Sequence, residues 1–395
     1  MLKNAKIAAA KTRVSLPGSV ALFVSGVALA ATCAPTARAA QKDILVGVNY
    51  FAGWWEKQPN KWHHGNKDWR PLYPDRRPLL GEYNTQATMD REIIAAADHG
   101  IAFFQFLWYG ADEERENEPL LNRGVEQFMK SPHAGRLKFV IEYCNHPPFG
   151  ITSLERWRTC VAYWVKCMQH PSYLRVGGRP VFKIHGAGQF YEQVGRTAEG
   201  VDRFLGILRS AAREAGLGEL TIGSGGNGPE PFRDDHWMLK RLDYNNEYMA
   251  VPNIERTEAD LPYAMLAQYH REWRAGHTND AIPTVPTIAA GWNPRPWQDD
   301  QRPCFAFPTR AEWTETLQQL KADLEKGVYG FPLPNGGVQP AFTIYAWNEF
   351  GEGGIVAPTK GHGYMMLEGI QEVFGPTSPS VQKATSSPMT KDPQR

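Results

Sequence analysis

The chain has 395 residues, of which 42% are hydrophobic and 22% are charged, and its formal net charge is +1. This composition predicts one large α/β domain with a full-sized core, and five cysteines in a chain of this length exclude a small disulfide scaffold. Because no basic stripe stands out, we expect no nucleic-acid partner.

The N-terminal segment is typical of an export signal. Lysines and an arginine between positions 3 and 13 form a positive segment, an apolar segment runs from Val20 to Ala31, and Ala37-Arg38-Ala39 is typical of a cleavage site. The apolar segment is too short to span a bilayer comfortably. We therefore predict a signal peptide over residues 1–39, no stable membrane span, and an exported protein that is periplasmic or secreted.

From Ile44 onward, short β-rich segments alternate with amphipathic helical segments. The predicted strands cover residues 44–54, 101–110, 137–146, 179–186, 220–228, 241–248, 282–292 and 341–353. The predicted helices lie near residues 85–99, 120–129, 157–168, 201–208, 263–275 and 310–326, and a last helix ends near Phe374.

This alternation predicts an α/β fold, a (β/α)8 TIM barrel in a single domain over residues 40–375. A doubly wound open sheet is the competing architecture, but no glycine-rich dinucleotide fingerprint follows the first strand. Residues 376–395 are rich in Ser, Pro, Thr and Lys, which predicts a disordered tail.

Aromatic, amide, histidine and carboxylate residues recur where the predicted strands end. Barrel enzymes place their active sites at those ends, and sugars are bound by aromatic faces together with amides and carboxylates. We expect no metal and no cofactor, because no set of ligands has metal-binding spacing. The predicted substrate-binding residues are Tyr50, Trp54, Trp108, Tyr109, Glu142, His146, His185, Asn246, Glu247, Trp292, Trp347 and Asn348.

The last predicted strand ends in the sequence WNEFGEG, residues 347–353. Its two carboxylates, Glu349 and Glu352, are three residues apart in a glycine-bearing turn and can project into one cleft. Glycosidic cleavage needs such a pair, because one group protonates the leaving oxygen while the other deprotonates or stabilises the attacking partner. The spacing alone is equally compatible with Glu349 capping the next segment while Glu352 is solvated.

The segment AWNEFGEGGIVAP, with GYMMLEGIQEVFG after it, resembles the C-terminal signature of glycoside hydrolase family 99 and its WbsX-like relatives. Residues 100–110, 170–185 and 286–297 agree with that resemblance, which covers most of the chain after the export signal. It implies a (β/α)8 barrel that cleaves α-mannoside-type linkages internally and with retention. It also implies that Glu349 assists the sugar 2-hydroxyl as internal nucleophile, that Glu352 is the general acid/base, and that Glu142 binds substrate.

Other functions stay open at this point. Glu247 could pair with Glu349 in a conventional double displacement, or it could bind substrate or fix a loop. The chain could also be a non-catalytic glycan-binding protein, or a polysaccharide-assembly protein on the same barrel. We favour a monomeric, exported glycoside hydrolase whose partner is a polysaccharide or glycan substrate.

Overall fold

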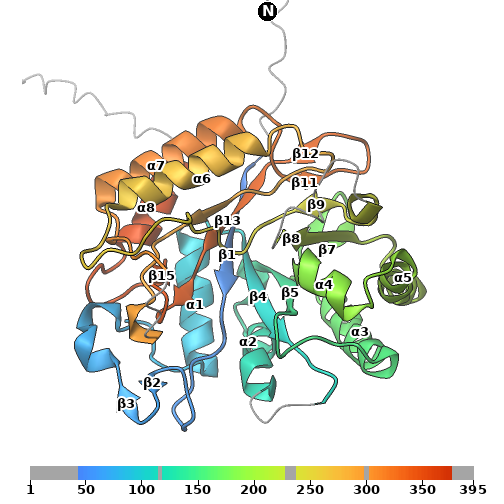
Figure 1. Ribbon diagram of the computed structural model, residues 1–395, viewed down its shortest axis with the longest axis horizontal. Coiled ribbons are helices and arrows are strands. Elements are labelled where there is room, and N and C mark those ends of the chain that lie inside the picture. Colours follow the sequence, from blue (N-terminus) through green and yellow to red (C-terminus); the bar gives the residue numbers. More distant parts are fainter. Residues whose placement is uncertain (1–42, 114–117, 227–236, 298–301, 376–395) are drawn as a thin grey trace, which may run out of the picture. The chain divides into compact units, whose positions relative to one another are not determined.

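The computed structural model describes residues 43–113, 118–226, 237–297 and 302–375. The predicted signal peptide and the predicted C-terminal tail lie outside these residues. Within the described ranges, no helix combines the length and the apolar character that a membrane crossing requires. The described residues belong to one compact unit, in which strands lie at the centre and helices lie outside them (Figure 1).

The main sheet is built from parallel strands in the order β10-β13-β1-β4-β5-β7-β8-β9. A bridge between Asn245 and Thr284 joins the last strand of this path to the segment that enters the first, so the sheet closes into a ring. The predicted (β/α)8 barrel is therefore confirmed. Its strands are β1 (Leu45–Tyr50), β4 (Phe103–Tyr109), β5 (Lys138–Cys144), β7 (Arg179–Gly186), β8 (Thr221–Gly225), β9 (Tyr244–Asn245), β10 (Thr287–Ala289) and β13 (Ala341–Tyr345).

The helices begin where the sequence supplies side-chain caps. Thr85, Ser153, Thr197 and Thr309 each accept a hydrogen bond from a backbone N–H of the first helical turn. The helices are α1 (Gln86–Asp98), α2 (Glu118–Lys130), α3 (Leu154–Met168), α4 (Ala187–Gln193), α5 (Ala198–Glu214), α6 (Tyr263–Gly276), α7 (Arg310–Leu324) and α8 (Met365–Phe374).

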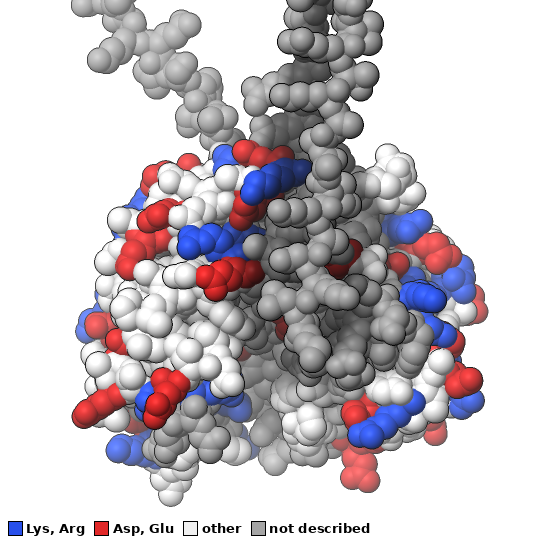
Figure 2. Space-filling view, turned by 45° about the horizontal axis from the view of Figure 1, so that its top comes forward, with Lys and Arg blue, Asp and Glu red and all other residues white. Residues whose placement is uncertain are grey.

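Short elements decorate the loops. The described residues contain three two-stranded hairpins: β2 (His63–His64) with β3 (Lys67–Asp68), β11 (Phe331–Pro332) with β12 (Val338–Gln339), and β14 (Asn348–Glu349) with β15 (Gly354–Ile355). A further strand, β6 (Arg175–Val176), pairs with β7. The 3-10 turns are η1 (Arg70–Leu72), η2 (Pro74–Arg76), η3 (Ala134–Arg136), η4 (Trp237–Arg241) and η5 (Arg295–Trp297). Outside the barrel, charged side chains of both signs are interspersed over the described surface in Figure 2.

The interior of the barrel is layered, because side chains two residues apart on a strand face the same side. The lowest layer is apolar and includes Phe103, Val140, Val181, Tyr244, Val285 and Ala341. Two residues further along each of these strands, the side chains are polar and buried. This second layer, which we call the polar layer, consists of Asn49, Gln105, Glu142, Lys183, Asn246, Thr287 and Thr343.

Candidate active site

The WNEFGEG segment folds into a hairpin above the end of β13. β14 pairs antiparallel with β15, and Glu352 lies in the turn between them. Gly353 has φ +85°, and a Cβ there would lie 2.9 Å from the backbone nitrogen of Asn293. That same nitrogen donates to the Glu352 carbonyl at 2.5 Å. The glycine therefore lets the turn approach the loop after β10, which fixes where Glu352 stands.

Glu349 and Glu352 line one pocket of about 620 Å³ at the carboxyl ends of the strands. Glu349 is 4% exposed, and its Oε1 accepts a hydrogen bond from the Tyr248 hydroxyl at 2.6 Å. Its Oε2 has no hydrogen-bond partner within the described part of the chain. The hydroxyl of Tyr345, at the end of β13, donates to Oε2 of Glu352. Each carboxylate of the predicted pair is thus held by its own tyrosine.

The electrostatics of the pair distinguish its two members. Burial, together with repulsion from Glu352, raises the pKa of Glu349 well above its ordinary value. The hydrogen bond from Tyr248 and the charge of Lys61 lower that pKa, but by less. Glu349 therefore keeps a proton at pH values where an exposed glutamate is ionised.

Glu142 lies in the polar layer beneath the pocket and is not part of its lining, so its contact with substrate stays a prediction. Its carboxylate is fully buried, with Lys183 Nζ at 3.0 Å and His185 Nδ1 at 2.7 Å from Oε1. The lysine contact is an ion pair whose angles fall outside those of a hydrogen bond. Burial alone would raise the pKa of Glu142, but Lys183 and His185 outweigh it, so the pKa is lowered. Glu142 therefore orients His185, whose other ring nitrogen is left for the pocket.

Two residues predicted as aromatic contacts, Tyr50 and Trp108, do not line the pocket, because their side chains point away from the barrel interior. Tyr50 is fully buried and donates to Glu92 Oε2 on α1 at 2.6 Å. The indole of Trp108 packs between β4 and α3, with its ring centroid 5.1 Å from that of Trp164. Successive side chains of a strand alternate between faces, so the neighbour Tyr109, which lines the pocket, excludes Trp108 from it.

Four further predicted contacts serve the scaffold and do not line the pocket. The side-chain amide of Asn348 accepts from the backbone N–H of Phe51 and donates to its C=O, each at 2.8 Å. The backbone carbonyl of Asn348 accepts from the Trp54 indole at 2.8 Å. Asn246 donates within the polar layer, to Thr343 Oγ1 at 2.9 Å among others. Trp347 is fully buried against an outward-facing residue of β4. The structure therefore gives Asn348, Trp54, Asn246 and Trp347 contacts within the scaffold, and none of them is part of the pocket lining.

The remaining predicted residues do line the pocket: Tyr109, His146, His185, Glu247 and Trp292. Several other residues of the site were not predicted from the sequence. Tyr248 and Tyr345 hold the two carboxylates, and Lys61, Trp297 and Arg302 contribute lining groups or cations around them. Tyr248 and Tyr345 stand two residues after members of the polar layer, so strand alternation was the signal that could have found them.

The side chain of Arg76 stabilises the hairpin that bears the two carboxylates. Arg76 in η2 donates from Nη1 to the Phe350 carbonyl and from Nη2 to the Asn293 carbonyl, each at 3.0 Å. No carboxylate of the described residues forms an ion pair with it. Arg76 therefore joins the turn that bears Glu352 to the loop after β10.

We expect Arg76→Ala to lower the free energy of unfolding by about 2 kcal/mol, because two carbonyls lose charge-assisted hydrogen bonds, and to reduce turnover as the turn loosens. Arg76→Lys should recover only part of both losses, since one ammonium cannot bridge two carbonyls as a planar guanidinium does. Urea unfolding and initial rates measure these effects. Arg77→Ala is the matched control, because the exposed Arg77 side chain bonds, among the described residues, to Glu82 and to no carbonyl of the hairpin. Equal effects of the two alanine variants would contradict the role of Arg76.

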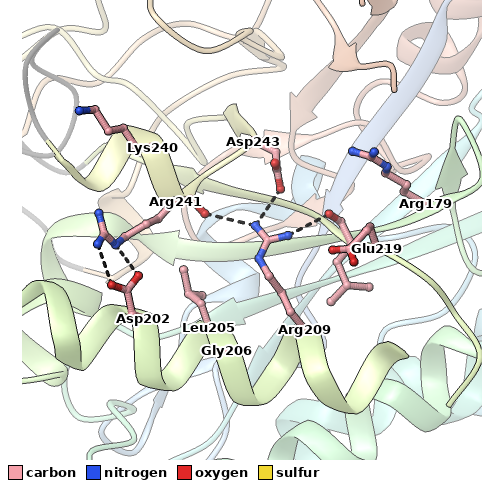
Figure 3. Close-up of a pocket in the computed structure, with 10 residues that line it drawn as sticks. Arg179, Asp202, Leu205, Gly206, Arg209, Glu219, Lys240, Arg241 and Asp243 are labelled. Carbon is pink, nitrogen blue, oxygen red and sulfur yellow. Dashed lines mark hydrogen bonds and ion pairs between the residues drawn. The ribbon is translucent and has the colours of Figure 1, made fainter. Parts of the chain in front are cut away.

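A second pocket, at the opposite ends of the strands, is lined by side chains that mostly satisfy one another (Figure 3). Asp243 accepts from Arg209 at 3.1 Å, and Asp202 accepts from Arg241 at 2.7 Å. Its carboxylates are paired with arginines, so this pocket offers no acid pair of the kind found at the barrel mouth.

Comparisons with known proteins agree with this architecture. One solved structure, the GH99 endo-alpha-mannosidase from Bacteroides thetaiotaomicron, superposes with a TM-score of 0.52 at 14% identity, covering 83% of this chain and 95% of that one. Another, described as a glycoside hydrolase-like protein, gives a TM-score of 0.55 at 17% identity, covering 84% and 94%. At these identities the likeness shows the fold alone.

No curated protein sequence matches the chain significantly. A protein-family model described as "Glycosyltransferase WbsX" matches residues 151–370, which is more than half of the chain. The resemblance inferred from the last strand is thereby confirmed, and the chain belongs to the WbsX family, on a barrel shared with family 99 glycoside hydrolases.

Proposed function

We propose that this protein is an exported glycoside hydrolase that cleaves α-linked, mannoside-type bonds inside a polysaccharide or glycan, with retention of anomeric configuration. The observation that supports it is the carboxylate pair: Glu349 and Glu352 lie on one hairpin, line one pocket, and are each fixed by a tyrosine hydroxyl. Endo action and the mannoside class come from the likeness to the endo-alpha-mannosidase fold. Export comes from the N-terminal signal.

The proposed reaction proceeds in two steps. The raised pKa of Glu349 favours a proton on that carboxyl, but the reaction proceeds from the form of the coupled pair in which the one proton lies on Glu352. In that form the Glu349 carboxylate takes the proton of the sugar 2-hydroxyl, whose oxygen attacks the anomeric carbon and forms a 1,2-anhydro ring. Glu352 gives its proton to the departing glycosidic oxygen. In the second step Glu352 takes a proton from water, the water oxygen opens the ring at the anomeric carbon, and Glu349 returns its proton to the 2-oxygen. Two inversions give net retention.

The pair of carboxyls must hold one proton for this reaction, so we expect a bell-shaped pH dependence of kcat/KM. Its alkaline limb reports the loss of that last proton, which the raised pKa of Glu349 places well above the pH at which exposed glutamates ionise. In Tyr248→Phe the hydrogen bond that lowers this pKa is gone. The pKa of Glu349 then rises, and the alkaline limb should move to higher pH. A limb that stays in place would contradict control of Glu349 by Tyr248.

The proposed function is tested with a panel of α- and β-linked polysaccharides, followed by NMR of the anomeric protons of the first-formed product. We expect release of new reducing ends from an α-linked member, with the α-anomer formed first. Formation of the β-anomer, or cleavage of β-linked members alone, would contradict the proposal. Comparison of the N-terminus of protein recovered outside the cytoplasm with the predicted cleavage after residue 39 tests export.

The description of the matching family model supports a second candidate, a glycosyl transferase acting through the same centre. In the second step a sugar hydroxyl would replace water as the group from which Glu352 takes a proton. Reducing-end assays separate the two: a hydrolase releases sugar to water, whereas a transferase yields longer saccharides at low acceptor concentrations. A glycan-binding protein without activity would need only one of the two acids.

A further inference from the structure

The pocket contains a third carboxyl that the proposed reaction does not use. Glu247 lies on the pocket lining, and its Oε1 accepts a hydrogen bond from the backbone nitrogen of Gly226 at 2.6 Å. No group of the described residues donates to its Oε2, which is left toward the pocket. Glu247 is partly buried, and this burial raises the pKa of its carboxyl. An acceptor of this kind gains when a ligand supplies the missing donor.

The backbone around Glu247 is fixed relative to the acid pair. Its carbonyl accepts from Thr287 Oγ1 at 2.5 Å, and the preceding Asn246 is bonded to three groups of neighbouring strands. The following residue, Tyr248, holds Glu349 through its hydroxyl. A ligand group bound by Glu247 is therefore held at a defined position relative to Glu349.

Glu247 is nevertheless not a partner of the acid pair. The charges that shift the pKa of Glu349 belong to Glu352 and Lys61. Those that shift the pKa of Glu247 belong to Lys183, His185 and His277. Its hydrogen bond to Gly226 holds it beside the end of β8. We therefore assign Glu247 to substrate binding and the chemistry to Glu349 and Glu352.

We propose that Glu247 is a specificity-determining residue, whose free carboxyl oxygen accepts a hydrogen bond from a hydroxyl or protonated amino group of the sugar chain bound across the pocket. This inference rests on the proposed function, because the acid pair defines where the scissile bond lies. A sugar that presents no donor at this point leaves the buried carboxyl unpaired, and such sites reject the analogue that lacks the group.

The experiment measures kcat and KM separately for the wild type, Glu247→Ala, Glu247→Gln and Glu349→Gln on the polysaccharide that the panel identifies. We expect Glu247→Ala to raise KM by about tenfold to a hundredfold, the range for a lost hydrogen bond to a charged group, with kcat changed by less than about threefold. If the donor is a hydroxyl, the KM of Glu247→Gln stays close to that of the wild type, because an amide oxygen still accepts. If the donor is an ammonium group, the KM of Glu247→Gln stays as high as that of Glu247→Ala.

The exposed Glu214 on α5, converted to glutamine, is the matched control and should leave both constants unchanged. Thermal unfolding of each variant separates loss of binding from loss of fold. Unchanged KM in a folded Glu247→Ala variant would overturn the inference while the proposed function stands. Loss of kcat in Glu247→Gln, as deep as that of Glu349→Gln, would also overturn it and would place Glu247 in the chemistry. A wild type that cleaves no glycan would overturn both proposals together.

Discussion

Glu352→Gln and Glu349→Gln should each lower turnover by about 10²- to 10⁴-fold, the range for removing a positioned acid or base. The two variants should differ on an α-glycosyl fluoride of the substrate sugar. Fluoride leaves without protonation, so Glu352→Gln should recover most of the first step on that substrate. Glu349→Gln should not recover, because the proposed first step still needs a base for the 2-hydroxyl proton when the leaving group is fluoride.

Both variants should remain folded, because glutamine matches glutamate in size and still accepts from the tyrosine that holds it. Thermal unfolding checks this point, and Glu214→Gln serves again as the exposed control. Wild-type rates in both pocket variants on a verified substrate would refute the catalytic assignment. Recovery of Glu349→Gln on the fluoride, with none for Glu352→Gln, would reverse the two roles.

Lys183→Met is the substitution with the largest expected effect on stability. Lys183 and Glu142 are each fully buried in the polar layer, with Nζ 3.0 Å from Oε1. Removing one member of a buried pair leaves an uncompensated charge and costs about 3–5 kcal/mol of unfolding free energy. The double variant Glu142→Gln/Lys183→Met removes both charges and should recover much of that loss. Urea unfolding of the four forms gives the coupling energy.

The free energy of unfolding should depend on pH with opposite signs in the wild type and in Lys183→Met. In the wild type the pKa of Glu142 is lowered by its partners, so its contribution to stability is present above the unfolded pKa and lost as pH falls through the folded one. In Lys183→Met burial acts with less opposition and the pKa of Glu142 rises, so acidification should stabilise that variant. A Lys183→Met protein that is as stable as the wild type, with the same response to acid, would contradict the ion pair.

Strand and helix periodicity was enough to predict the barrel, because β-rich segments alternate with amphipathic helices along most of the chain. The lengths of the strands were harder to predict from the sequence. The sixth strand, predicted over residues 241–248, is only Tyr244–Asn245, and the seventh is only Thr287–Ala289. Beyond those residues isolated backbone hydrogen bonds are mixed with side-chain ones such as those of Asn246, and an apolar-polar pattern cannot tell this mixture from a regular ladder.

The candidate site was predicted in part. Adjacent residues at strand ends, such as Trp108 and Tyr109, were both proposed as contacts, although alternation admits only one of each pair. The polar layer was missed as a unit because Gln105 and Lys183 lie within otherwise apolar strands that are distant in sequence. Only closure of the barrel brings Gln105 Nε2 within 3.2 Å of Asn246 Oδ1.

The hairpin that bears both acids has a consequence for when the protein can become active. β13 enters the barrel between β1 and β10, and Asn348 is clamped to Phe51 at the other end of the sequence. Neither carboxylate can be in position until the last strand has docked beside the first. A chain that crosses a membrane unfolded, N-terminus leading, would stay inert throughout its passage, and hydrolysis would begin only after its final strand had emerged and joined its first.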